Sequence, residues 1–132
     1  MKFVSLYEHP DLWEVPWQLL KEREAHENIS HSAVPTWEAH REFIQGRPYA
    51  EWWGLMADEC VGAMYLTFRK EIGIGILKAH RRKGYATEAL RWVVENIKGP
   101  LLANINPWNE KSLELFRSVG FTGPIQVTLR HE

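Results

Sequence analysis

The chain has 132 residues and a mass of 15.5 kDa, the size of one domain with a hydrophobic core of its own. Hydrophobic residues make up 45% of it and charged residues 25%, a balance that excludes a disordered chain. Sixteen basic against seventeen acidic side chains give a formal net charge of −1, so the composition indicates neither nucleic acid nor an anionic membrane as a partner.

The sequence carries no mark of export or of a metal site. Its one cysteine, Cys60, excludes an internal disulfide and a cysteine-rich zinc site. No stretch approaches the roughly 20 apolar residues of a membrane span, and the beginning of the chain lacks the apolar core of a secretion signal. We therefore expect a soluble, cytoplasmic protein.

Helical spacing dominates the first 48 residues. A short strand is expected over about residues 2–8. Asp11 is a candidate cap for a helix whose apolar residues recur at helical spacing over 12–20. Thr36 precedes a second stretch in which apolar residues recur at helical spacing, and this stretch ends at Gly46 and Pro48.

Strand patterns follow residue 48. Segments 51–57 and 60–68 flank a short turn and predict a hairpin. The next segment, 71–77, alternates strictly, with three isoleucines on one face and Gly73 and Gly75 on the other. Glycines on a strand face indicate either that a ligand approaches the backbone closely or that a helix packs tightly there.

Two more helices are predicted in the last third of the chain. The apolar residues of 86–97 form one stripe, and Asn109 begins a second helix that Gly120 ends. Short strands are expected at 101–105 and 124–130. This order of elements predicts an α+β or mixed-sheet α/β domain with at least one parallel strand pair.

The segment before the first of these helices suits an anion. Three consecutive cations, Arg81, Arg82 and Lys83, precede Gly84, and the unpaired N–H groups of a helix start attract negative charge. The spacing fits neither a Walker loop nor Gly-x-Gly-x-x-Gly. A diphosphate ester bound without magnesium is one interpretation, and an ordinary basic surface turn is the other.

Two motifs of the second half resemble those of the GNAT family of N-acetyltransferases. Arg81-x-x-Gly84-x-Ala86 is similar to the family's Arg/Gln-x-x-Gly-x-Gly/Ala signature, whose amides hold the pyrophosphate of acetyl-coenzyme A. Segment 109–121 resembles the family's Asn-x-x-Ser-x-x-Leu-Tyr-x-x-x-Gly-Phe block. The strand at 71–77 and the helix after Gly84 resemble the family's fourth strand and third helix.

The resemblance implies one domain over 1–132 with a mixed, mostly antiparallel sheet, about four helices, and fourth and fifth strands that are parallel and splayed. Residues 1–48 would form the acceptor side, and 49–132 would form the sheet and the acetyl-CoA site. The implied cofactor contacts are Ile74, Ile76, Leu77, Lys78, Arg81, Arg82, Lys83, Gly84, Tyr85, Ala86, Thr87, Asn109, Ser112 and Phe116.

The implied reaction is acetyl transfer from acetyl-CoA to a primary amine by direct attack. Glu71 is the first choice for the general base, because histone-acetylating relatives place a glutamate near this point; a solvent-exposed carboxylate at a strand end is the alternative. The backbone N–H of Ile76 would contact the thioester oxygen. Asn109 would cap its helix and touch the cofactor.

One departure from the family pattern concerns the proton for the leaving thiolate. The family often places a tyrosine where this chain has Phe116, which has no exchangeable proton. Water or another side chain would then serve. The departure also keeps open a degenerate member that binds acyl-CoA without turnover. A nucleic-acid binder that uses the three cations is a third hypothesis, which the net charge disfavours.

The acceptor is expected against the first two helices and the neighbouring loops. Arg23, His26 and Trp37 are the candidates there, and Asn104 and Asn106 are candidates at the end of the fifth strand. Core packing for the tryptophan and turn chemistry for Asn106 are the alternatives. The sequence decides neither the amine nor the choice between monomer and homodimer.

Overall fold

The computed structural model describes residues 1–23, 34–123 and 129–131. A four-stranded antiparallel sheet in the order β1-β2-β3-β4 forms its centre. The strands are β1 (Lys2–Ser5), β2 (Glu51–Met56), β3 (Cys60–Leu66) and β4 (Ile72–Ile76). The helices are α1 (Glu14–Glu22), α2 (Trp37–Gln45), α3 (Tyr85–Asn96) and α4 (Glu110–Ser118).

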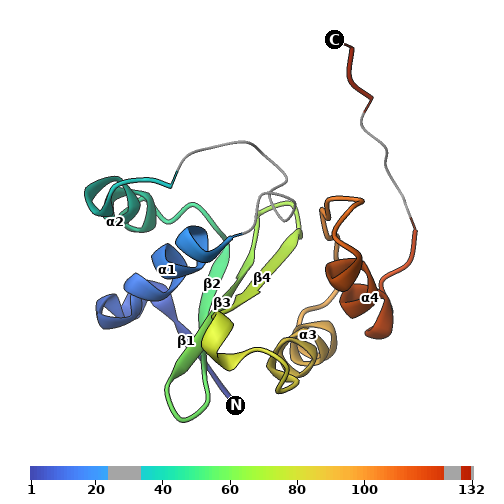
Figure 1. Ribbon diagram of the computed structural model, residues 1–132, viewed down its shortest axis with the longest axis horizontal. Coiled ribbons are helices and arrows are strands. Elements are labelled where there is room, and N and C mark those ends of the chain that lie inside the picture. Colours follow the sequence, from blue (N-terminus) through green and yellow to red (C-terminus); the bar gives the residue numbers. More distant parts are fainter. Residues whose placement is uncertain (24–33, 124–128, 132) are drawn as a thin grey trace.

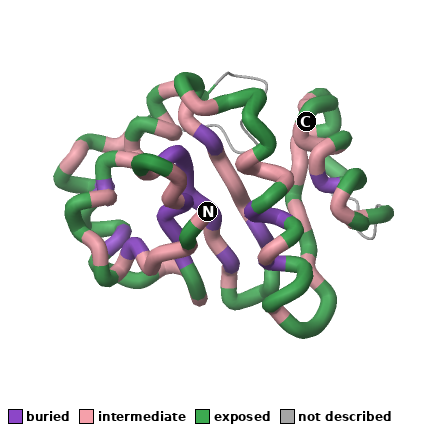
Figure 2. The backbone as a smooth tube through the Cα atoms, turned by 90° about the horizontal axis from the view of Figure 1, so that it is seen from below, coloured by how far each residue is buried: buried purple, intermediate pink, exposed green. Residues whose placement is uncertain are grey.

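The helices cover both faces of the sheet. Helices α1 and α2 lie on one side and α3 and α4 on the other (Figure 1). Each side has a core of its own, and Figure 2 marks the buried residues in purple. The middle residues of β2 and β3 are buried, whereas those of β4 are half-buried. Leu90, Val93 and Phe116 pack on the α3 and α4 side, and Trp13 and Ile44 on the other. This is the mixed α/β arrangement that the sequence predicted.

The strand pattern predicted the hairpin and the alternation of β4 correctly. Strands β2 and β3 pair with a register shift between Leu55 and Met56. Ile72 and Ile76 belong to the core beneath α3 and α4, whereas Gly75 faces Leu19 of α1. One face of β4 therefore packs against the α3 and α4 side of the molecule, and the other face packs against the α1 side.

The first strand was predicted correctly but three residues too long, and the prediction for the first helix cap was wrong. Strand β1 ends at Ser5, and two short 3-10 turns, Leu6–Glu8 and Pro10–Leu12, precede α1. Trp13, not Asp11, is the N-cap of α1 and makes no side-chain cap. The indole of Trp13 donates a 2.6 Å hydrogen bond to the carbonyl of Leu6, which is fully buried. Burial of these two residues bends the chain away from an extended path.

The predicted strand at 101–105 is reduced to one parallel bridge between Glu71 and Leu102. Ile72 N donates to Leu102 O at 2.8 Å, and Leu102 N donates to Lys70 O at 2.9 Å. Of the strand predicted at 124–130, residues 124–128 lie outside the described residues, and Leu129 is not in a strand.

Side-chain caps fix the starts of α2 and α4 as the sequence predicted. Thr36 Oγ1 accepts from Ala39 N at 3.2 Å, and Asn109 Oδ1 accepts from Ser112 N at 3.2 Å. Helix α3 differs, because its N-cap is Gly84, which has no side chain and adopts a left-handed φ of 81°. Its first N–H groups therefore have no cap from the chain itself.

Buried His40 makes the fold sensitive to acid. Its Nε2 lies 2.8 Å from the carbonyl oxygen of Trp13, and burial lowers its pKa below the usual 6.5. As the pH falls below about 6.5, the unfolded chain takes up a proton at His40 that the folded chain does not, so the melting temperature should fall. In the His40→Gln variant, whose residue 40 does not titrate, the melting temperature should fall less steeply between about pH 7.5 and about pH 5 than in the wild type. Protonation of the folded His40 ring near pH 6.5 in NMR titrations would contradict this.

Candidate active site

One edge of β4 faces away from its neighbour. Thr67 N donates to Glu71 O and Leu77 N donates to Val61 O, so the odd-numbered residues of β4 bond to β3. The N–H groups of Ile72, Ile74 and Ile76 alternate with these and point the other way. Ile72 N uses this edge to bond Leu102, and the chain beyond that bridge leaves the ladder. The N–H groups of Ile74 and Ile76 therefore face an opening between β4 and segment 103–106.

A second set of unpaired amides follows the short turn after β4. Within the described part of the chain, no hydrogen bond reaches the backbone N–H groups of residues 82–87. A Cβ added to Gly84 would meet nothing within 4 Å, so the backbone is open to a ligand there. Since these N–H groups lie at the positive end of α3, they suit an anion.

Cations surround these amides. Arg81 Nε donates to Ile76 O at 3.0 Å, which holds its guanidinium beside the end of β4. Arg82 has a positive φ of 64°, and both it and Lys83 are exposed. Two of the predicted contacts already have partners, because Leu77 N bonds Val61 O and Lys78 N donates to a carboxylate oxygen of Glu22 at 2.9 Å.

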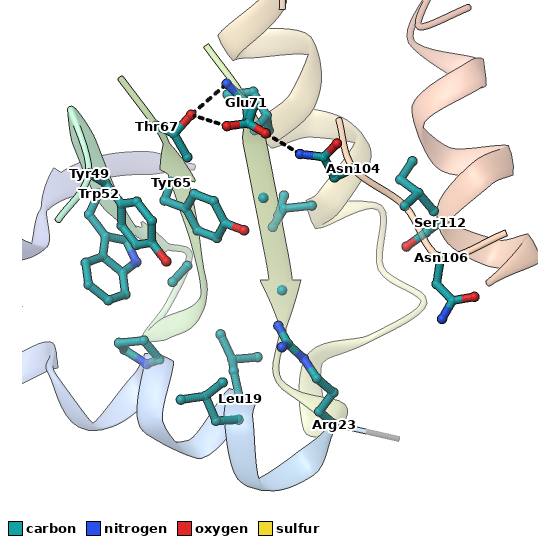
Figure 3. Close-up of a pocket in the computed structure, with 18 of the residues that line it drawn as sticks. Leu19, Arg23, Tyr49, Trp52, Tyr65, Thr67, Glu71, Asn104, Asn106 and Ser112 are labelled. Atoms are coloured by element: carbon teal, nitrogen blue, oxygen red, sulfur yellow. Dashed lines mark hydrogen bonds between the residues drawn. The ribbon is translucent and has the colours of Figure 1, made fainter. Parts of the chain in front are cut away.

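A pocket of about 600 Å³ opens where β4 meets α1, α2 and the start of α4 (Figure 3). It brings together five residues that the sequence singled out from distant segments: Arg23, Glu71, Asn104, Asn106 and Asn109. Ile74, Ser112 and Phe116 also line it. The pocket thus joins the predicted acceptor side to the open edge of β4.

Glu71 is a positioned side chain and not a free carboxylate at a strand end. One of its carboxylate oxygens accepts from Thr67 Oγ1 at 3.1 Å, and the other accepts from Asn104 Nδ2 (Figure 3). The hydroxyl of Thr67 in turn accepts from Glu71 N at 3.0 Å. Asn104 therefore orients Glu71, a contact that sequence spacing did not predict.

Tyr65 lies across β4 because Gly73 leaves room for it. A Cβ on Gly73 would lie 2.1 Å from Tyr65 Cζ and 2.4 Å from its hydroxyl oxygen. The Tyr65 ring also stacks on Tyr49, with centroids 4.1 Å apart. Burial raises the pKa of Tyr65 above 10.0, so its hydroxyl stays protonated at neutral pH. The spacing of residues along the sequence does not indicate Tyr65, because only its pairing across the strands places it at the pocket.

Phe116 is buried at the opposite wall of the pocket. Its ring meets Phe121 edge to face, with centroids 5.1 Å apart. Asn109 and Ser112 line the same wall, and the cap between them fixes the first turn of α4 there. Residue 116 thus contributes a buried phenyl ring to this wall and no hydroxyl group.

Of the predicted acceptor residues, Trp37 lies outside this pocket and packs against Trp17, with ring centroids 5.1 Å apart. His26 lies outside the described residues. Tyr49 and Tyr65, which the sequence did not single out, line the acceptor half of the pocket together with Trp52.

Comparison with known proteins identifies the class to which this fold belongs. The sequence model of the acetyltransferase (GNAT) domain matches residues 1–122, so the chain belongs to the GNAT acetyltransferase family. GNAT domains use acetyl-CoA as co-substrate.

A solved structure from Bordetella pertussis, assigned to the GnaT family of acetyltransferases, is similar in fold. It has a TM-score of 0.61 and 18% sequence identity over 94% of this chain and 83% of that chain. None of the curated proteins compared with the chain matched it. In the described residues no helix combines the length and the apolarity needed to cross a bilayer.

Gly84→Asp should abolish stabilisation by acetyl-CoA, because it adds a negative side chain where the diphosphate would bind. Gly99→Asp is the matched control: Gly99 also has a positive φ, 92°, with no atom near its Cβ position, so both variants carry the same strain of roughly 1–2 kcal/mol. Acetyl-CoA at about 100 times its dissociation constant stabilises a protein by about 2.7 kcal/mol. Melting curves should show this gain in the wild type and in Gly99→Asp only. A folded Gly84→Asp with the wild-type dissociation constant would contradict the assignment.

Proposed function

We propose that the protein is an acetyl-CoA-dependent N-acetyltransferase that acts on a primary amine by direct attack in a ternary complex. The observation that carries the proposal is the closeness of two sets of amides along the chain. The unpaired amides at the start of α3 follow the open edge of β4 after one short turn, Lys78–His80, and that edge begins at Glu71. Bound acetyl-CoA supplies a thioester, which is already activated toward an amine and needs chiefly to be positioned.

The chain offers two sets of groups for holding the co-substrate. The N–H groups of residues 82–87, with the cations of Arg81, Arg82 and Lys83, would bind the diphosphate. The N–H groups of Ile74 and Ile76 would donate to the extended arm and to the thioester oxygen, where negative charge develops during attack. Asn109 and Ser112 would face the same arm from α4.

Glu71 would take the proton from the attacking amine. An alkyl amine with a pKa near 10.4 is only about one part in a few thousand neutral at pH 7, so a base is needed. Thr67 and Asn104 hold the carboxylate at the edge of the pocket, next to the strand that would carry the thioester. This supports Glu71 over the other titratable groups of the segment, since His80 pairs with Glu59 at 2.7 Å.

Tyr65 would give a proton to the departing thiolate. As the C–N bond forms and the C–S bond breaks, the amine proton passes to Glu71 and the thiolate takes the phenolic proton, which water then restores. The position of the hydroxyl over Gly73, one residue before the open N–H of Ile74, supports this role. Phe116, on the other wall, has no proton to give.

Glu71→Gln should lower kcat by at least tenfold at neutral pH and leave the dissociation constant of acetyl-CoA unchanged, because the amide keeps the shape but not the basicity. The deficit should shrink as the pH approaches the pKa of the amine, where no base is needed. Glu95→Gln, on the exposed face of α3, is the matched control. A pH–rate profile equal to that of the wild type would remove Glu71 from the mechanism.

Tyr65→Phe should lower kcat while preserving the stack on Tyr49, since only the hydroxyl is lost. Phe116→Tyr in the Tyr65→Phe background should restore part of the rate by offering a phenol from the other wall. Tyr49→Phe removes a neighbouring hydroxyl and should leave kcat near that of the wild type. Equal kcat in Tyr65→Phe and the wild type would refute the proton-donor role.

A second function is favoured by Phe116 alone: a module that binds acyl-CoA without turnover. Such a module would gain stability from acetyl-CoA as the enzyme does, but it would transfer no label to any amine. Mass spectrometry of an amine pool incubated with isotope-labelled acetyl-CoA separates the two functions.

A further inference from the structure

The part of the pocket that the structure describes carries one charged side chain of each sign. Among the described residues that line it, Arg23 is the cation and Glu71 the carboxylate. His40 also lines the pocket, but its Nε2 bonds Trp13 O and burial lowers its pKa, so it adds no charge at neutral pH. Among the described lining residues, the charges are therefore a single pair of opposite sign.

The two charges lie toward opposite ends of β4. Glu71 immediately precedes the strand. Arg23 follows α1, whose Leu19 lies against Gly75 and whose Glu22 accepts from Lys78 N. Figure 3 places the Arg23 guanidinium at the tip of β4 and the Glu71 carboxylate at its start. At a rise of 3.3–3.4 Å per residue, the backbone between Glu71 and Gly75 spans roughly 13 Å.

The wall between the charges is aromatic. Tyr65 lies over Gly73, midway along β4, and Tyr49 stacks on it. Both charges act on the Tyr65 hydroxyl. Burial is the main cause that raises its pKa, and to a smaller extent Arg23 lowers the pKa and Glu71 raises it. A ligand that reaches from one charge to the other would thus pass along these rings.

We propose that the acceptor is a small primary amine that also carries an anionic group, a carboxylate or a phosphate, at the far end of a slender apolar body. This rests on the proposed function, in which Glu71 receives the amine. The guanidinium of Arg23 would bind the anion, for which its planar fork is suited. A polyamine would instead bring a second positive charge to Arg23, which disfavours it.

The test uses matched probe pairs that differ in the anion: 6-aminohexanoate with 6-amino-1-hexanol, 4-(aminomethyl)benzoate with 4-methylbenzylamine, and 6-aminohexyl phosphate with 6-amino-1-hexanol. Two readouts are taken, kcat/KM with acetyl-CoA and the calorimetric dissociation constant with saturating coenzyme A. The variants are Arg23→Gln and, as a matched control, Arg41→Gln, an exposed arginine of α2 outside the pocket. A comparison of the carboxylate pairs with the phosphate pair shows which of the two anions the pocket prefers.

The anionic member of at least one pair should bind and react roughly tenfold better in the wild type and in Arg41→Gln, a gain of about 1.4 kcal/mol. Arg23→Gln should abolish this preference and leave the KM of acetyl-CoA unchanged. Equal or absent binding of both members in every pair, or a preference that survives Arg23→Gln, overturns the inference. So does a rise in the KM of acetyl-CoA without loss of preference, which would assign Arg23 to the co-substrate. Preferential binding without turnover supports the inference and counts against the proposed function instead.

Discussion

The alternation of hydrogen bonds along β4 is the constraint on which the site depends. A strand offers each successive N–H to opposite edges, so pairing with β3 through Glu71, Gly73 and Gly75 commits the isoleucine amides to the other edge. That edge would normally be filled by a fifth strand. Among the residues that the structure describes, the pairing stops after one bridge at Leu102, and the N–H groups of Ile74 and Ile76 have no strand partner on that edge. Open strand edges usually attract another chain, and this one is screened by the helices on both faces of the sheet.

The same alternation divides the side chains of β4 between two tasks. The isoleucines anchor the strand in the core beneath α3 and α4. The glycines place no side chain on the opposite face, so Leu19 and Tyr65 can approach the backbone there. The two interpretations of these glycines, ligand approach and tight packing, are therefore not exclusive: at Gly73 the packed neighbour, Tyr65, is itself a wall of the pocket.

Local chemistry accounts for the parts of the fold and the site that the sequence predicted. The cap at Asn109, the helix start after Gly84 and the alternation of 71–77 depend on neighbours within a few residues, so spacing alone reveals them. The strand predicted at 101–105 has suitable residues, but strand formation needs a partner over its whole length, and the structure provides one at Leu102 only. The Asp11 cap was wrong because Trp13 and Leu6 are buried together, a tertiary effect.

The site residues missed by sequence reasoning came from pairings between segments. Thr67 and Tyr65 belong to the chain before β4, and only the antiparallel register places them against Glu71 and Gly73. The link from Asn104 to Glu71 spans 33 residues. Antiparallel pairing of segment 60–68 with segment 71–77 could have found Tyr65, because that register sets its ring opposite Gly73, which has no side chain to exclude it.

The hydrogen bond from Lys78 N to Glu22 couples the two halves of the molecule mechanically. Glu22 is the last residue of α1, one position before Arg23, and Lys78 opens the turn that leads to the amides of α3. Outward movement of the end of α1 or a shift of the turn would break this hydrogen bond. The last turn of α1 and the segment that leads to α3 are therefore tethered to each other by one peptide-to-carboxylate contact.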